Sequence, residues 1–146
     1  PDIECYYNSF NAICEVTMLT SRDQWYNEGQ PVMRHSRAFE EANAALPNYC
    51  LFVAPTLHKD TINTFYISVK YEYEGQKQRI IPITIPQLKL ILKVVQQVLK
   101  KNKPFTHNYI KQLYDECVDM SNVKDSTQWL DKINTSINLW SERLIA

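Results

Sequence analysis

Two acidic residues occupy positions where an isolated carboxylate would be unfavourable. Asp2 opens a short strand-like run, and Glu15 lies within the apolar run at residues 12–17. A carboxylate inside an apolar strand is costly unless it is paired or bound to a metal. If the two runs form a hairpin, both carboxylates meet at one end of the sheet, and a cation between them would relieve their repulsion. Two carboxylates and a backbone carbonyl on a strand edge suit Mg²⁺, which predicts metal-assisted hydrolysis.

Two short strands are expected to carry this pair. Residues 1–7 and 12–19 have strand-like composition and are separated by turn-forming residues. Glu15 should share one strand face with Ile13 and Thr17, because side chains alternate along a strand. A Glu15 that faces solvent from an edge strand is the alternative interpretation.

The segment after these strands should be helical. Ser21 followed three residues later by Gln24 matches a capping box, which predicts a helix beginning near Arg22. Gly29 is suited to end that helix, and Pro31 is suited to the first turn of another that runs towards residue 45. The pattern therefore predicts two helices with a break between them.

The rest of the chain alternates strand and helix patterns. Residues 60–74 fit both a helix and an alternating strand, and the helix is the favoured interpretation. Further strands are expected at residues 49–54 and 79–85, and further helices at residues 86–102, 106–120 and 127–145. This order predicts an α/β fold in one domain spanning residues 1–146, with a helical tail at the C-terminus.

The composition excludes several classes of protein. Sixteen basic and sixteen acidic residues give zero net charge in 146 residues, which argues against tight binding of nucleic acid by bulk electrostatics. With only two glycines, the chain has no Gly-rich phosphate loop or dinucleotide fingerprint. No apolar run is long enough to span a membrane, so no membrane partner is expected.

The four cysteines favour a structural role. They lack the close pairs of a zinc site, and their neighbours are mostly apolar or aromatic. Buried, reduced thiols are the favoured interpretation, which suits a cytoplasmic protein. The chain begins at Pro1 without an initiator Met, so we expect an N-terminal segment to precede it.

Blocks in the first part of the chain resemble a known family. Pro1-Asp2 followed by Glu15 is the frame of the PD-(D/E)xK nuclease superfamily. Residues 15–24 (EVTMLTSRDQ), 28–35 (EGQPVMRH), 54–63 (APTLHKDTIN) and 80–84 (IIPIT) are similar to the cleavage domains of AlwI-like type IIS restriction endonucleases. The likeness is strongest to the small subunits of heterodimeric nicking/restriction endonucleases. It covers residues 1–85 well and the C-terminal helices loosely. The fold it implies is a restriction-endonuclease-like mixed sheet flanked by helices.

The resemblance implies a set of site residues. Asp2 and Glu15 match the family's metal-binding carboxylates, and the Val16 carbonyl is the implied third ligand of Mg²⁺. Glu28 and His35 match two further catalytic positions, and the spacings of thirteen, thirteen and seven residues agree with the family pattern. No position matches an organic cofactor site.

One position departs from the wider superfamily. Thr17 stands where most members carry a catalytic lysine. His35 is the favoured substitute, because a histidine can move protons near neutral pH. Glu28 would then either hold His35 or bind a second shell of metal-bound water. The predicted break at Pro31 leaves open whether Glu28 and His35 share a helix face.

The function implied by the resemblance is a Mg²⁺-dependent, site-specific deoxyribonuclease subunit of a bacterial cytoplasm. It would cut one strand of double-stranded DNA, while a larger subunit recognises the site and nicks the other strand. Two alternatives remain open: a stand-alone or homodimeric nuclease, and a catalytically inactive interaction module that keeps the nuclease fold.

Basic residues offer further candidates for phosphate contacts. Arg22, Arg34 and Arg37 could touch the DNA backbone, although a solvated helix face explains them nearly as well. His58 and His107 are interpreted as a loop residue and a helix-start residue.

The zero net charge conceals an uneven distribution. Residues 1–45 have a balance of −4, and residues 46–146 a balance of +4; within the latter, residues 70–111 reach +7. The sequence therefore predicts an acidic metal-binding end and a basic stretch that could face phosphates. It also predicts that tight binding of DNA depends on a partner.

Overall fold

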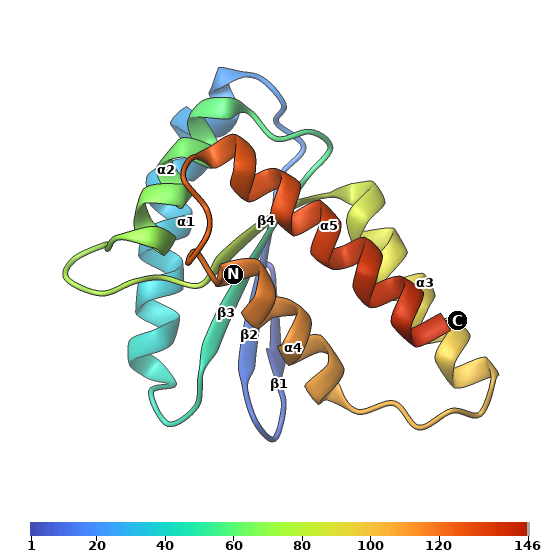
Figure 1. Ribbon diagram of the computed structural model, residues 1–146. Coiled ribbons are helices and arrows are strands. Elements are labelled where there is room, and N and C mark those ends of the chain that lie inside the picture. The colour runs from blue at the N-terminus through green and yellow to red at the C-terminus, as the bar shows by residue number, and fades with distance from the viewer. Residues whose placement is uncertain (146) are drawn as a thin grey trace.

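The computed structural model describes residues 1–145 and combines one sheet with helices on both sides (Figure 1). The strands are β1 (Ile3–Tyr6), β2 (Asn11–Val16), β3 (Asn48–Ala54) and β4 (Ile80–Thr84). The helices are α1 (Arg22–Ala42), α2 (Lys59–Lys70), α3 (Ile85–Lys100), α4 (His107–Val118) and α5 (Ser126–Ile145). The predicted α/β class is confirmed.

The sheet is mixed, with the strand order β1-β2-β3-β4. β1 pairs antiparallel with β2, whereas β2, β3 and β4 are parallel. Parallel neighbours need crossover helices, and right-handed crossovers in a constant direction place both helices on one face. α1 and α2 accordingly lie side by side on that face (Figure 1).

The other face is covered by the C-terminal helices. Tyr49 of β3 contacts Tyr114 of α4 and hydrogen-bonds Asp115, whereas Phe52 points to the opposite face and packs on Phe65 of α2. Trp129 of α5 is fully buried. The expected C-terminal helices therefore form a third layer of the core. Every residue of β3 is buried between the two helical layers, as its continuous apolar pattern predicted.

α1 is one continuous helix, so the predicted break is wrong. Gly29 lies in its interior, where an added Cβ would come within 3.3 Å of the Trp25 ring, and Pro31 also lies inside the helix. Proline lacks the N–H that would bond the carbonyl four residues earlier and costs about 3 kcal/mol in a helix interior. Val32 and Met33, directly after the proline, are buried in the core, and their packing offsets this cost.

The predicted capping box at the start of α1 is also absent. Ser21 is the N-cap, but its hydroxyl accepts the Asp23 N–H at 3.3 Å, while the Gln24 side chain bonds elsewhere. A complete capping box instead opens α3, where Thr84 and Gln87 bond one another's backbone N–H.

Most of the ambiguous segment at residues 60–74 is helical, because it forms α2. The residues at helical spacing, Ile62, Phe65 and Val69, are buried, whereas Ile67 and Tyr71 of the alternating pattern are exposed. A turn at Gly75 follows, where a φ of 87° suits glycine. The four cysteines are free thiols, and no helix within residues 1–145 is long and apolar enough to cross a membrane.

Candidate active site at the carboxyl end of β2

Asp2 and Glu15 meet where β1 and β2 pair. The antiparallel register joins Ile3 to Cys14, and one further step places Asp2 opposite Glu15. The Asp2 N–H bonds the Cys14 carbonyl at 3.1 Å, and its Oδ2 accepts the Val16 N–H at 2.7 Å. Directly opposed residues of antiparallel strands project from the same face, so two carboxylates lie side by side here.

Glu15 is buried within the sheet. β2 lies between β1 and β3, and Glu15 is only 7% exposed, so the interpretation of a solvent-facing Glu15 on an edge strand is wrong. Its Oε1 lies 2.8 Å from Nδ1 of His35 on α1. A carboxylate can only accept this bond, so Nδ1 carries the proton and Nε2 keeps its lone pair when the ring is neutral. The His35 side chain is half exposed, which gives Nε2 access to solvent.

Glu28 lies close to the same group. Burial raises the pKa of the Glu28 carboxyl, and the negative charges of Glu15 and Asp2 raise it further, whereas a hydrogen bond from Thr17 and the neighbouring His35 lower it. The four residues chosen from the sequence are therefore near enough to interact electrostatically. Thr17, the residue directly after β2, is buried as well.

The continuity of α1 explains this arrangement. Seven residues are almost two full turns of an α-helix, so Glu28 and His35 lie on one face of α1. A hydrogen bond between Glu15 and His35 then connects β2 to α1, and Thr17, directly after β2, lies near Glu28. The residue later in the chain, Thr17, lies near the earlier residue of α1, as expected for a helix that returns antiparallel to the strand it follows.

The donor atoms at this end of the sheet fit a hard divalent cation in kind. The Val16 N–H points towards β1, and within a strand the carbonyl of the same residue points to the same side, next to Asp2. Asp2 and Glu15 each use one oxygen in a hydrogen bond and keep the other for a cation. Two carboxylates and one backbone oxygen are ligands that Mg²⁺ accepts. Within residues 1–145, no group of three or more His, Cys, Asp or Glu side chains is arranged to hold a metal.

Sequence reasoning missed the role of Gln24. Its carboxamide is fully buried, and Nε2 donates to the carbonyls of Leu19 at 2.8 Å and Thr56 at 2.7 Å. Its Oε1 accepts the His58 N–H at 2.8 Å. Gln24 therefore connects the segment after β2 to the segment after β3, at the carboxyl ends of these parallel strands, where Glu15 also lies. Its polarity among buried residues of α1 was the only available signal.

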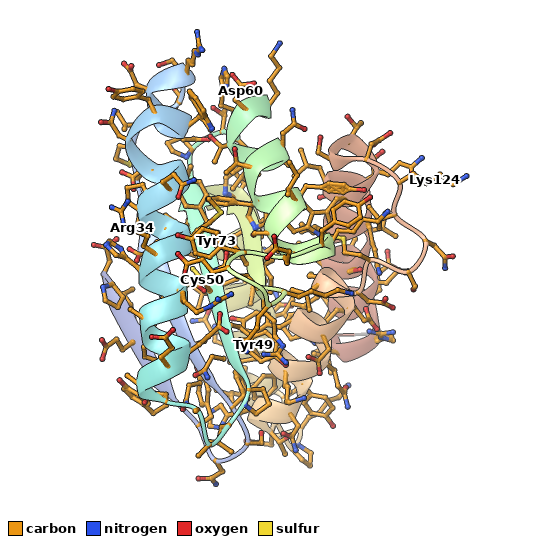
Figure 2. All side chains as sticks on the ribbon, turned by 90° about the vertical axis from the view of Figure 1, so that its left-hand side faces the viewer. Arg34, Tyr49, Cys50, Asp60, Tyr73 and Lys124 are labelled. Carbon is orange, nitrogen blue, oxygen red and sulfur yellow. The ribbon has the colours of Figure 1, made fainter. Side chains whose placement is uncertain are left out.

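The three arginines have different environments. Arg37 is buried, donates to the carbonyls of Glu74 and Gln76, and lies over the Tyr73 ring, so the prediction of an exposed phosphate ligand is wrong for it. Arg22 lies over Trp25 and stays largely exposed. Arg34 projects outward from α1 (Figure 2).

The two remaining histidines have structural positions. His58 is the N-cap of α2, where its Nδ1 accepts the Asp60 N–H at 3.2 Å. His107 begins α4 and stacks on Tyr7. These positions agree with their interpretation as a loop residue and a helix-start residue.

The fold is similar to that of a solved endonuclease subunit. Nine chains of known structure match this one significantly. One is the small subunit of the heterodimeric restriction endonuclease R.BspD6I, with a TM-score of 0.67 and 18% sequence identity. The match covers 91% of this chain and 64% of the other, so this chain spans less than two thirds of that subunit's length. No curated protein matches this chain significantly in sequence.

The sequence also matches a family model, that of the AlwI restriction endonucleases, over residues 1–91. This stretch is more than half of the chain and contains both strands and the whole helix of the acidic site. The chain therefore belongs to the AlwI restriction endonuclease family.

Proposed function

We propose that this chain is the DNA-cleaving subunit of a heterodimeric, site-specific restriction endonuclease. In this proposal a single cleavage domain uses Mg²⁺ to hydrolyse a phosphodiester on one DNA strand, and a larger subunit recognises the site. The observation that carries the proposal is the convergence of Asp2, Glu15, Glu28 and His35 at the carboxyl end of β2. Family membership and the likeness to an endonuclease small subunit support it.

Asp2 and Glu15, with the Val16 carbonyl, would hold the cation. When bound there, Mg²⁺ would lower the pKa of a coordinated water and offset negative charge on the phosphoryl oxygens. The buried position of Glu15 and its bond to His35 keep its free oxygen oriented, and the Val16 N–H does the same for Asp2. Because both ligands are fixed before a cation arrives, little ordering is needed on binding.

His35 is the residue suited to proton transfer. Its Nδ1–H is held by Glu15, so its exposed Nε2 can accept a proton and later return it. Glu28 adds negative charge beside the same group, where it would orient water or a hydrated cation. In this proposal each of the four residues has a role in the reaction, and no lysine is required.

We assign tight binding of DNA to a partner subunit. A chain with zero net charge and an acidic reaction centre has little positive field to hold a polyanion. The solved relative is one subunit of a heterodimer, which supports a larger recognition subunit for this chain as well. A stand-alone nuclease would need to bind DNA by itself, and the charge distribution of this chain does not supply that affinity.

Tethering tests this proposal without the natural partner. The chain would be fused to a heterologous sequence-specific DNA-binding domain and incubated with Mg²⁺ and supercoiled plasmid that carries the domain's site. We expect nicking of one strand near that site, and little cleavage by the untethered chain or by the fusion in excess EDTA. A fusion that binds its site yet leaves both strands intact would contradict the proposal, and efficient cleavage of random DNA by the free chain would remove the partner requirement.

A further inference from the structure

Helix α3 carries a second apolar stripe that the core does not use. Its first stripe is buried, and α3 packs on α5 and on strands β3 and β4. The second stripe, here called the α3 seam, consists of Leu88, Leu92, Val95 and Leu99. Leu92 and Leu99 are 60% and 58% exposed, although one apolar stripe is enough to pack a helix on a core. A helix that is apolar on so much of its surface is typical of one that is covered on more than one side.

We propose that the α3 seam is a docking surface for an acidic amphipathic helix of the recognition subunit. The seam residues follow one another in steps of four, three and four, and Ile85 continues the pattern at the start of the helix. This is the spacing of the a and d positions of a heptad repeat, whose side chains pack between those of a second helix. α3 lies at the margin of the helical layer beside α5 (Figure 1), and no other part of residues 1–145 covers Leu92 or Leu99. The inference rests on the proposed function, because it assigns the partner subunit to a named surface of this chain.

The charges beside the seam determine which helix can dock there. Lys89, Lys93 and Lys100 follow the seam along one side of α3, and α3 contains no acidic residue. None of these lysines forms a salt bridge with a residue in the described part of the chain. Charges that flank a heptad seam select the partner by attraction and repulsion. Acidic residues beside the apolar stripe of the partner helix would therefore pair with these lysines.

The same features disfavour two other occupants. Two copies of this chain packed through α3 would bring lysines together with no acidic residue on either helix, and this repulsion opposes self-association. DNA does not match the leucines, because apolar side chains make no hydrogen bonds to phosphates. An acidic amphipathic helix matches both the leucines and the lysines.

Binding of a synthetic helix tests the inference without the natural partner. The probe is a fluorescein-labelled peptide of three heptads, with leucine at the a and d positions and glutamate at the e and g positions. Repulsion between its own glutamates limits its self-association. By fluorescence anisotropy at about 50 mM salt, we expect the purified chain to bind this peptide at least about tenfold more tightly than a peptide with lysine at e and g. The preference should shrink at about 500 mM salt, because salt screens exposed charges.

Two sets of variants separate the roles of the leucines and the lysines. The double variant Leu92→Gln, Leu99→Gln should weaken binding of the glutamate peptide about tenfold or more, because it removes the apolar centre of the surface. The matched control Leu139→Gln changes a leucine of α5 that is 50% exposed and should bind within about twofold of wild type. The variant Lys89→Glu, Lys93→Glu keeps every leucine and should reverse the preference between the two peptides.

Several results would overturn the inference. Failure to bind either peptide, equal binding of both at low salt, or full binding by the folded Leu92→Gln, Leu99→Gln variant would refute an acidic-helix site. Sedimentation equilibrium that finds a dimer which this double variant dissociates would assign the surface to a second copy instead. Binding to vesicles of phosphatidylcholine and phosphatidylserine that the same variant loses would assign it to a membrane surface.

The tethered nicking assay tests the proposed function separately. The fused DNA-binding domain replaces the partner there, so the Leu92→Gln, Leu99→Gln fusion should nick within about twofold of the wild-type fusion. A loss of nicking by a folded fusion of this variant would show that the leucines serve the cleavage domain itself, and would refute the docking role. A wild-type fusion that binds its site without nicking would contradict the nuclease, while the peptide titrations would still decide whether the α3 seam binds an acidic helix.

Discussion

At the scale of single residues, the surroundings of Glu28 change the proton affinity of its carboxyl group. Burial, followed by the charges of Glu15 and Asp2, raises its pKa above the ordinary 4.5, and this outweighs the opposing effects of Thr17 and His35. The folded state therefore binds the Glu28 proton more tightly than the unfolded state does. Folding stability contributed by this group must fall as the pH rises from about 4.5 through the raised pKa.

Glu28→Gln removes this dependence and keeps the shape of the side chain. In low salt without Mg²⁺, we expect the variant to match wild type at pH 4 and to unfold at a higher temperature at pH 7. The gain should stay below about 1 kcal/mol, because the side chain is partly exposed and solvent screens it. Thermal unfolding from pH 4 to 8 measures the difference. A variant that is less stable than wild type at pH 7 but not at pH 4 would reverse the assigned sign.

The residue types and spacings predicted part of this site. An acidic residue in the apolar context of Glu15 indicated a functional carboxylate, and the hairpin placed Asp2 opposite it. Arg37 could not be predicted in this way, because its burial depends on carbonyls of residues 74 and 76, far away in sequence. Gln24 was assigned to a local cap for the same reason, since its partner Thr56 lies thirty-two residues away.

At the scale of elements, the continuity of α1 through Pro31 is what aligns Glu28 with His35. The interior proline leaves the Asn27 carbonyl without its helical N–H partner. We expect Pro31→Ala to raise the free energy of unfolding by about 1–3 kcal/mol, since it restores a hydrogen bond and removes a clash. Urea denaturation measures this gain.

Pro86→Ala provides the matched control for that substitution. Pro86 lies in the first turn of α3, where proline costs no helical hydrogen bond. Its replacement should leave stability unchanged or slightly lower it, by less than about 1 kcal/mol. A Pro31→Ala variant no more stable than wild type, or a gain of the same size at Pro86, would show that the interior proline carries no cost.

Most elements followed from the sequence, and the exceptions have a common cause. The apolar run of β3, the alternation of β2 and the apolar spacing of α2 are strong signals, because each records contact with the core over a whole element. The signals at Gly29 and Pro31 are local preferences worth a few kcal/mol at most. The core packing of Val32 and Met33, directly after Pro31, outweighs these preferences, and no local sequence pattern reports that packing.

At the scale of the whole molecule, the neutral charge is a sum of opposite regions. The acidic reaction centre lies in residues 1–45, whereas residues 70–111 carry most of the excess positive charge. On α3, the exposed Lys89, Lys93 and Lys100 make no ion pair with any described residue. They give the chain a modest, salt-sensitive attraction to phosphates that cannot replace a recognition subunit.

Binding of the free chain to a random-sequence 30-base-pair duplex measures that attraction. At 150 mM salt we expect a Kd weaker than about 10⁻⁵ M, in the range of non-specific binding, with clear tightening at 50 mM. Fluorescence anisotropy in EDTA separates binding from cleavage. A submicromolar Kd at 150 mM salt would contradict the assignment of the DNA grip to a partner.

The most direct test of the central claim compares substitutions of Asp2, which precedes β1, and of Glu4, which lies in β1. Both are measured in the tethered nicking assay with Mg²⁺. Asp2→Asn should reduce the nicking rate by about 10²-fold or more, because a cation ligand contributes several kcal/mol to the transition state. Glu4→Gln, which changes an exposed carboxylate within β1, should nick within about twofold of wild type. Equal nicking by Asp2→Asn and Glu4→Gln fusions that bind their site equally well would contradict the claim that this end of the sheet cleaves DNA.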